Sequence, residues 1–365
     1  MPTSRLRADE YAQRRGTVAD GLAGRKLDAL LVAFSPNVRY LSGFTGSNGS
    51  LLVMPGRAIL FSDPRYQIQA SEEVSCQVKI AKGSLVEAVA GAISRLRLRR
   101  IGYEPARMTC DWLDALRGKI PARASLEPVS GWIEELRMIK SAAELERIRK
   151  SVEINSRAFE QAVQQVKPGM RERDLAAELE YRMRRLGAEK PAFETIVAAG
   201  KRGALPHAQP TDARIENGSL VVVDMGAVQE GYSSDMTRML FLGSPSPKVR
   251  RTYRAVLEAQ QSAIEAVRPG ASTASVDRKA RKVLEGYGLE KAFVHSTGHG
   301  LGLEIHEPPR LGKRDKQRLQ PGMAITIEPG VYLEGFGGIR IEDTVVVTEN
   351  GCRILTPTSK ELRLV

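Results

Sequence analysis

The chain has 365 residues, and its 55 Lys and Arg against 43 Asp and Glu give a formal net charge of +12 at pH 7. This length is sufficient for two domains that each bury a core, and three widely spaced cysteines exclude a disulfide framework and a cysteine-based zinc motif. The start of the chain has no apolar signal core and no segment reaches membrane-spanning length, so we expect a cytoplasmic protein without membrane contact.

The first part of the chain alternates apolar strand patterns with helical patterns. We predict three strands and one amphipathic helix, at residues 28–34, 50–54, 58–62 and 84–98. The capping box Ser84-Leu-Val-Glu87 opens the helix. This alternation is typical of an α/β domain, expected over residues 1–130. The connection to the next domain is predicted over residues 131–140.

The second part, residues 141–365, contains an internal repeat. It begins with a second capping box, Ser141-Ala-Ala-Glu144, and Val166-Lys-Pro168-Gly169 recurs as Val267-Arg-Pro269-Gly270. A helical pattern lies on either side of each Pro-Gly, and strand-like stretches with histidines follow each helix pair. The helices are predicted at 141–166, 171–186, 247–267 and 274–287. A helix-helix-strand-strand unit repeated twice predicts a pseudo-twofold α/β (α+β) domain with its site between the two halves.

Four carboxylates in this second part lie where an acid is costly. Asp224 ends the apolar run 220–223, and Asp235 lies in the sequence YSSDMTR. Glu328 follows the apolar run 324–327, while Glu342 follows Ile341 and precedes three valines. An acid at the end of a buried strand must be paired, protonated or bound to metal. Capping of a loop or pairing with an arginine would explain any one of them alone.

All four histidines lie among these acids. His207 is in the sequence LPHAQP, and His295, His299 and His306 share the segment HSTGHGLGLEIHE. Together with the four carboxylates they indicate a metal site. Four carboxylates and one imidazole form a hard, oxygen-rich ligand set that suits two divalent ions. We expect manganese first, with cobalt, iron or zinc as alternatives.

The series Asp, Asp, His, Glu, Glu with these flanks resembles the pita-bread metallopeptidases, which include methionine aminopeptidase, prolidase and aminopeptidase P. The resemblance implies that the metal ligands are Asp224, Asp235, His299, Glu328 and Glu342. It implies that Asp235 and Glu342 bridge the two ions.

The same resemblance implies roles for the remaining residues of the site. His207 and His306 are expected to contact the scissile carbonyl and the tetrahedral intermediate. His295 is expected in the pocket, where a core histidine is the alternative. Arg340 is expected in the hydrogen-bond network of the site, where a plain ion pair is the alternative. We also expect Glu328 to relay a proton.

The N-terminal part resembles the domain shared by creatinase, prolidase and aminopeptidase P, which methionine aminopeptidase lacks. The sequences VRYLSGFTGS (38–47) and DPRY (63–66) are most similar to short bacterial aminopeptidase P proteins. The expected activity is therefore that of an Xaa-Pro aminopeptidase, which removes the first residue from peptides with proline in second position by attack of a metal-bridging hydroxide. The resemblance also implies a homodimer.

Three alternatives remain open from the sequence. An Xaa-Pro dipeptidase (prolidase) has the same metal ligands, creatinase works without metal, and an inactive pita-bread relative would serve as a binding protein. The net charge is the only feature that favours a polyanion partner for such a binding protein. The strongest basic cluster, residues 95–100, lies at the end of a predicted helix, where basic residues complement the helix dipole. We expect peptide substrates and no nucleic-acid partner.

Overall fold

The computed structural model describes residues 8–365, and the chain divides into two compact units. The first unit ends at Leu136 and the second covers Arg137–Val365. Both combine helices with β-sheets, which confirms the expected mixed α/β class.

The first unit is built on one six-stranded sheet with the strand order β4-β3-β2-β1-β5-β6. Strand β1 pairs parallel with β5 and antiparallel with β2, and helix α4 contributes the apolar face that packs against this sheet. The strands are β1 (Ala29–Val32), β2 (Gly49–Met54), β3 (Arg57–Ser62), β4 (Gln77–Ile80), β5 (Arg100–Tyr103) and β6 (Ser125–Pro128). The helices are α1 (Ala8–Gly24), α2 (Ser35–Ser42), α3 (Gln67–Glu73), α4 (Leu85–Arg95) and α5 (Cys110–Arg117), and α6 (Trp132–Met138) runs across the boundary between the units.

The N-terminus of α4 differs from the expected capping box. The Ser84 hydroxyl accepts a hydrogen bond from the Glu87 amide at 3.2 Å, as predicted. The Glu87 carboxylate, however, pairs with the Lys119 ammonium at 3.0 Å instead of returning to the Ser84 amide. Only the serine half of the box is therefore formed as predicted, and the Glu87 carboxylate forms an exposed ion pair with Lys119.

The second unit contains four long helices and two main sheets. The helices are α7 (Ala142–Val163), α8 (Glu172–Arg185), α9 (Pro247–Glu265) and α10 (Thr273–Gly286). One sheet contains β8 (Ile196–Ala199), β9 (Leu220–Met225), β12 (Met236–Phe241) and β20 (Arg363–Leu364). The other contains β13 (Gly298–Gly300), β14 (Glu307–Leu311), β15 (Ala324–Ile327), β18 (Asp343–Thr348) and β19 (Gly351–Ile354). Shorter pairings involve β7 (Lys190–Pro191), β10 (Ala227–Gln229), β11 (Tyr232–Ser233), β16 (Gly330–Leu333) and β17 (Gly337–Arg340).

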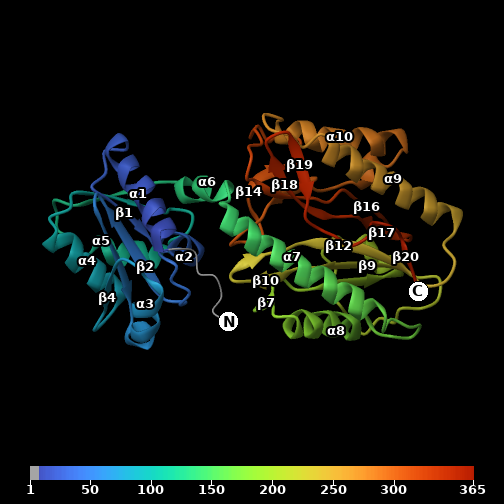
Figure 1. The fold of residues 1–365 in the computed structure, drawn as a ribbon, viewed down its shortest axis with the longest axis horizontal. Helices are drawn as coiled ribbons and strands as arrows, with labels where there is room; N and C mark the ends of the chain where they lie inside the picture. The colour runs from blue at the N-terminus through green and yellow to red at the C-terminus, as the bar shows by residue number, and fades with distance from the viewer. Residues whose placement is uncertain (1–7) are drawn as a thin grey trace. The chain divides into compact units, whose positions relative to one another are not determined.

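The helices of the second unit cover its strands from two sides, with α7 and α8 on one side and α9 and α10 on the other (Figure 1). Along β9, Val221 and Val223 pack into the cluster formed with α7 and α8. Leu220 and Val222 pack into the cluster that includes α9 and α10. Because both faces of β9 are buried, the strand is apolar at every one of these positions rather than at alternate ones. The helix pairs expected from the repeat are thus present, one pair in each half.

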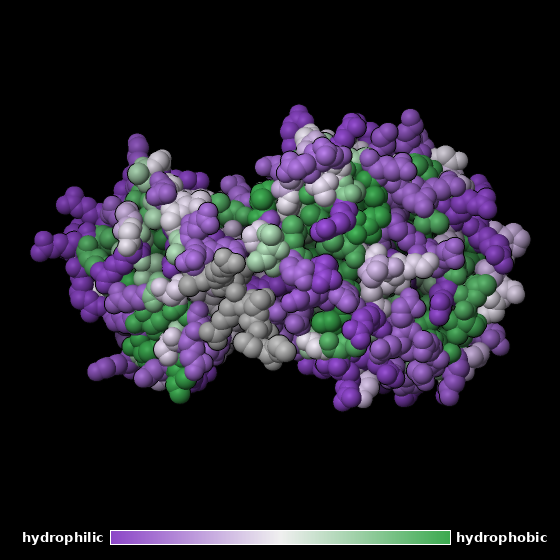
Figure 2. Space-filling view, viewed as in Figure 1, coloured by the Kyte–Doolittle hydropathy of each residue, from purple (hydrophilic) through white to green (hydrophobic). Residues whose placement is uncertain are grey.

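Hydrophilic side chains cover much of the visible surface of the chain, and small apolar areas are scattered between them (Figure 2). Within residues 8–365, no helix combines the length and the apolar character that crossing a bilayer would require.

Candidate metal centre

Two antiparallel strand pairs bring the four carboxylates to one place. In the first pair, β9 and β12, Asp224 lies opposite Thr237, and Asp235 immediately precedes β12. In the second pair, β15 and β18, Ile327 lies opposite Asp343, so that the next position of the ladder holds Glu328 and Glu342. The Glu342 amide donates to the Thr237 carbonyl at 3.2 Å and joins the two pairs. Acids separated by more than one hundred residues thereby meet at the centre of the unit.

Two glycines allow the strand with His299 to approach these acids. A Cβ atom on Gly298 would lie 1.9 Å from the Thr326 carbonyl oxygen, and one on Gly300 would lie 2.2 Å from the Pro308 carbonyl oxygen. The His299 amide donates to the Thr326 hydroxyl at 3.1 Å. Only glycine on both sides of this histidine permits such close packing, which explains the sequence GHG.

The His299 imidazole is oriented with one nitrogen toward the acids. Its Nδ1 lies 3.0 Å from the Gly300 carbonyl oxygen, so a proton placed on Nδ1 donates to this carbonyl. Its Nε2 then carries the lone pair and lies 3.3 Å from Glu328 Oε1 and 3.6 Å from Asp235 Oδ2. A metal-binding histidine commonly has this arrangement, in which the second nitrogen donates to a backbone carbonyl.

Three buried carboxylate oxygens of the site have no hydrogen-bond partner within residues 8–365. They are Asp224 Oδ1, Asp235 Oδ1 and Glu342 Oε1. Ligand atoms of Asp235, His299 and Glu342 lie within 4.8 Å of one another. Buried acceptors are nearly always satisfied, so three unsatisfied oxygens beside an available imidazole nitrogen need an explanation. These donors fit a divalent cation, because its charge would satisfy all of them at once.

The electrostatics of the acids agree with this interpretation. Burial raises the pKa of Asp235 and of Glu342 well above the ordinary range, and neighbouring carboxylates raise both further. Burial also raises the pKa of Asp224, against the opposing charge of Arg340. Burial acts in the same direction on Glu328, but without metal the hydrogen bond and charge of a protonated His299 outweigh it and hold the pKa of Glu328 below its usual value. Metal binding would require His299 to release this Nε2 proton. A bound cation would remove the repulsion that raises the first three pKa values.

Arg340 connects the acids to His295 through a tyrosine. Its Nη2 donates to Asp224 Oδ2 and its Nη1 donates to the Tyr332 hydroxyl, both at 2.6 Å. The Tyr332 hydroxyl lies 2.9 Å from His295 Nε2, and His295 Nδ1 lies 2.8 Å from the Ser296 carbonyl oxygen. Arg340 therefore forms an ion pair and belongs to a network as well. His295 is half-buried at the end of this network, and its burial lowers its pKa.

Three supporting residues were not predicted from the sequence. The Thr237 hydroxyl accepts from Arg340 Nε at 2.9 Å and donates to Glu342 Oε2 at 2.7 Å. The Thr326 hydroxyl lies 3.3 Å from Glu328 Oε1, and Tyr332 bridges to His295 as described. Both threonines stand two positions from a predicted ligand, a spacing that places side chains on one face of a strand and could have identified them. The sequence around Tyr332 carries no such signal.

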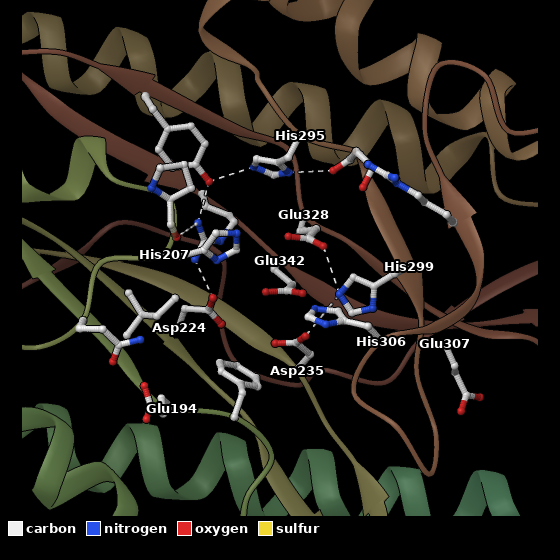
Figure 3. A pocket seen from close by; sticks show the side chains of 18 of the residues that line it. Glu194, His207, Asp224, Asp235, His295, His299, His306, Glu307, Glu328 and Glu342 are labelled. Carbon is white, nitrogen blue, oxygen red and sulfur yellow. Dashed lines mark hydrogen bonds and ion pairs between the residues drawn. The ribbon is translucent and has the colours of Figure 1, made fainter. Parts of the chain in front are cut away.

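The acids and histidines line one cavity of about 750 Å³. Figure 3 shows His299, Glu328, Glu342, Asp235 and Asp224 converging on a common point, with the ring of His306 beside that of His299. The centroids of these two rings are 4.4 Å apart. The structure brings together all nine site residues expected from the sequence, which are His207, Asp224, Asp235, His295, His299, His306, Glu328, Arg340 and Glu342.

Comparisons with known proteins identify related chains. Residues 146–349 match metallopeptidase family M24, and residues 14–139 match the creatinase/prolidase N-terminal domain. The Xaa-Pro dipeptidase of Pyrococcus horikoshii is 39% identical over 336 residues, which are 92% of this chain and 94% of the relative.

Solved structures of Xaa-Pro peptidases also superpose on this chain. An Xaa-Pro dipeptidase from Bacillus anthracis superposes with a TM-score of 0.94 at 36% identity, covering 98% of this chain and 100% of that one. An X-Pro aminopeptidase from Thermotoga maritima superposes with a TM-score of 0.88 at 37% identity, covering 93% and 98%. The expected pita-bread fold with a creatinase-type N-terminal domain is confirmed.

The expectation of an aminopeptidase is wrong, and the prolidase alternative is favoured. Curated relatives from Pyrococcus and Lactobacillus whose names state an activity are Xaa-Pro dipeptidases, and prolidases from two Pyrococcus species share the fold. The expectation depended on two short N-terminal motifs. Asp63 of the second motif accepts hydrogen bonds from the Arg65 amide at 2.9 Å and from the Asn48 side chain at 2.6 Å. These hydrogen bonds hold a local turn around the second motif.

Proposed function

Because this chain belongs to metallopeptidase family M24, we propose that it is an Xaa-Pro dipeptidase, a metallo-exopeptidase that hydrolyses dipeptides with proline as the second residue. The observation that carries the proposal is the group of buried carboxylates around His299, three of which present an unsatisfied oxygen to the same cavity. Such a group is costly unless it binds divalent metal, which the family implies.

We propose that two divalent ions would be held by Asp224, Asp235, His299, Glu328 and Glu342, with Asp235 and Glu342 available to both. The oxygen-rich donor set favours manganese, with cobalt or zinc as alternatives. When bound, the two ions supply an activated water and polarise the carbonyl of the scissile bond.

The protein's own residues then handle protons and the developing negative charge. Glu328 takes a proton from the attacking water and delivers it to the proline nitrogen, which needs one because an Xaa-Pro bond is a tertiary amide. The rings of His207 and His306 line the cavity, and within residues 8–365 their nitrogens form no hydrogen bond. Both are therefore available to donate to the carbonyl oxygen as it becomes negative.

Arg310 offers a reason for selecting dipeptides. It lies opposite His299 in the β13–β14 ladder, so both side chains are on one face of the sheet, and it lines the cavity. Within residues 8–365, no hydrogen bond or ion pair engages its guanidinium, whereas Arg340, the other arginine lining the cavity, is bound to Asp224. A dipeptide places its free carboxylate directly after the proline ring, where an unpaired arginine can bind it. A longer peptide has no carboxylate at that point.

Hydrolysis of Leu-Pro, Leu-Pro-Gly and Leu-Pro-Gly-Gly by chelator-treated protein tests the proposal, with Mn²⁺, Co²⁺ or Zn²⁺ added back singly. Cleavage of Leu-Pro alone is expected. Equal cleavage of the longer peptides would refute the dipeptidase assignment. Binding of two ions without any cleavage would instead indicate an inactive relative that serves as a binding protein.

Other expectations from the sequence remain proposals. They are an N-terminal domain over 1–130, a connection over 131–140, a catalytic domain over 141–365, a homodimeric state and a location in the cytoplasm. Light scattering tests the homodimer, and cell fractionation tests the location.

A further inference from the structure

The loop that carries His306, residues 301–306, connects β13 to β14 and contains one glycine, Gly302. Its first residues are held by backbone hydrogen bonds, from the Leu301 amide to the Ala324 carbonyl at 3.2 Å and from the Ser233 amide to the Gly302 carbonyl at 2.8 Å. His306 itself is exposed to the cavity, and its ring is placed by the backbone around it. The residue that follows it, Glu307, begins β14.

The Glu307 side chain folds back beneath this loop. It is only 2% exposed, and a Cβ atom on Gly302 would lie 2.7 Å from its Oε1. The Glu304 amide approaches its Oε2 at 3.5 Å. The carboxylate thus fills the space under the loop, and the glycine is needed to leave room for it.

Two buried cations hold this carboxylate from below. Lys140 Nζ lies 2.8 Å from Glu307 Oε1, and Arg137 donates through Nη2 to Glu307 Oε2. Arg137 Nη1 also binds Glu304 Oε2 at 2.9 Å, so one guanidinium contacts the loop at Glu304 and the start of β14 at Glu307. The side chains of Arg137 and Lys140 are 2% and 1% exposed.

The backbone next to Lys140 is itself held by hydrogen bonds to the segment that precedes β15. The Lys140 amide donates to the Gly322 carbonyl at 3.0 Å, and Ile139 pairs with Met323 in an isolated β-bridge. Met323 directly precedes β15, the strand that ends before Glu328. The loop with His306 is therefore tied to the same strand that presents one of the acids of the site.

Stability alone is a weak reason for this arrangement. Replacement of a buried ion network by apolar residues of similar size is often neutral or stabilising, because two or more charges must be desolvated. A network of this kind can instead select one geometry, since a 1 Å error in a catalytic group can reduce a rate by about 100-fold.

We propose that Arg137 and Lys140 are positioning residues, which act through Glu304 and Glu307 to hold the loop so that the His306 ring stays against His299. This inference rests on the proposed function, in which His306 donates to the reacting carbonyl. Neither cation touches the substrate.

A double-mutant cycle tests the inference in the metal-loaded, full-length protein. Arg137→Met should lower kcat for Leu-Pro by about 10-fold or more with a smaller change in KM. In a His306→Ala background the same substitution should cause no further loss, because the group that it positions is already absent. An equal loss of kcat in both backgrounds would overturn the proposal. Arg137→Lys should recover part of the rate, since it retains a charge for Glu307.

A matched control separates positioning from general destabilisation. Arg14 in the first unit is also buried and binds Glu10 at 2.6 Å and the Tyr40 carbonyl at 3.0 Å. Arg14→Met is expected to lower the melting temperature without changing kcat. If Arg137→Met fails to fold, Lys140→Met removes only one of the two partners of Glu307 and is expected to show the same dependence on His306.

Amide hydrogen exchange of residues 301–306 gives a result that does not depend on activity. Arg137→Met should accelerate exchange in this loop relative to both wild type and Arg14→Met. Unchanged exchange would overturn the positioning role even in an active dipeptidase. A wild-type protein that cleaves no Xaa-Pro dipeptide would instead refute the proposed function, and the exchange comparison would still decide whether the cations hold the loop.

Discussion

The hydroxyl of Thr237 is a single buried group on which two charged residues of the site depend. It receives a hydrogen bond from Arg340 Nε at 2.9 Å and donates one to Glu342 Oε2 at 2.7 Å, and its residue is fully buried. Thr237→Val keeps the shape of the side chain and removes the hydroxyl. The substitution leaves Glu342 Oε2 and Arg340 Nε without the hydroxyl as a hydrogen-bond partner.

The expected effect is on metal affinity rather than on the fold. Hydrogen bonds to charged groups contribute about 1.5–3 kcal/mol each. Loss of a group that orients a metal ligand typically weakens metal binding by about 10- to 100-fold. This factor corresponds to about 1.4–2.7 kcal/mol, similar to the loss of one such hydrogen bond. We therefore expect Mn²⁺ to bind Thr237→Val about 10- to 100-fold more weakly than wild type.

Competition with a chelator of known affinity measures this change, and circular dichroism confirms that the variant is folded. Thr358→Val is the matched control, because Thr358 is buried and its hydroxyl has no hydrogen-bond partner within residues 8–365. The control is expected to bind Mn²⁺ as the wild type does. A folded Thr237→Val with unchanged affinity would refute the idea that this hydroxyl orients Glu342.

Three further outcomes are expected. Wild type should prefer Leu-Pro to its C-terminal amide, and Arg310→Gln should reduce kcat/KM for Leu-Pro by roughly 10- to 100-fold and remove the preference. The control is Lys316→Gln, which should retain the preference because Lys316 is exposed and does not line the cavity. Glu328→Gln should lose most of its turnover, and normal metal binding with full turnover would contradict the proton transfer. Burial raises the pKa of Glu307, but two buried cations outweigh it and hold that pKa below the ordinary value of 4.5. Because the folded pKa is the lower one, this carboxylate stabilises the fold above about pH 4.5 and less as the pH falls through the folded pKa. Glu307→Gln should therefore reduce the free energy of unfolding by roughly 3–5 kcal/mol at pH 7, and a difference from wild type that stayed constant below pH 4.5 would argue against the ion network.

Local features of the sequence were sufficient to predict α4 and the four helices of the second unit, and to mark the acids and histidines as candidates for a metal site. Helices α1, α2, α3, α5 and α6 were not predicted, and the set of metal ligands came from the family resemblance. Ser141 and Glu144 form the expected capping box of α7, because both partners lie within one helical turn. The acids at strand ends could be recognised because a carboxylate beside an apolar run is costly without a partner. The GHG sequence around His299 also has a local meaning, since only glycine permits the close approach of neighbouring strands.

Interactions between distant positions were decided only by the tertiary structure. The Glu87 carboxylate forms an ion pair with Lys119, which lies outside its own helix. Arg137 likewise binds Glu307, which is 170 residues away in the sequence. Such pairs depend on strand register and on the direction of each side chain, which local patterns do not encode. The activity was predicted wrongly because the prediction depended on two short N-terminal motifs, and Asp63 of the second forms hydrogen bonds within a local turn. The sequence thus determined which residue types were available to bind metal, while the fold decided which groups surround them and leave Arg310 unpaired in the cavity.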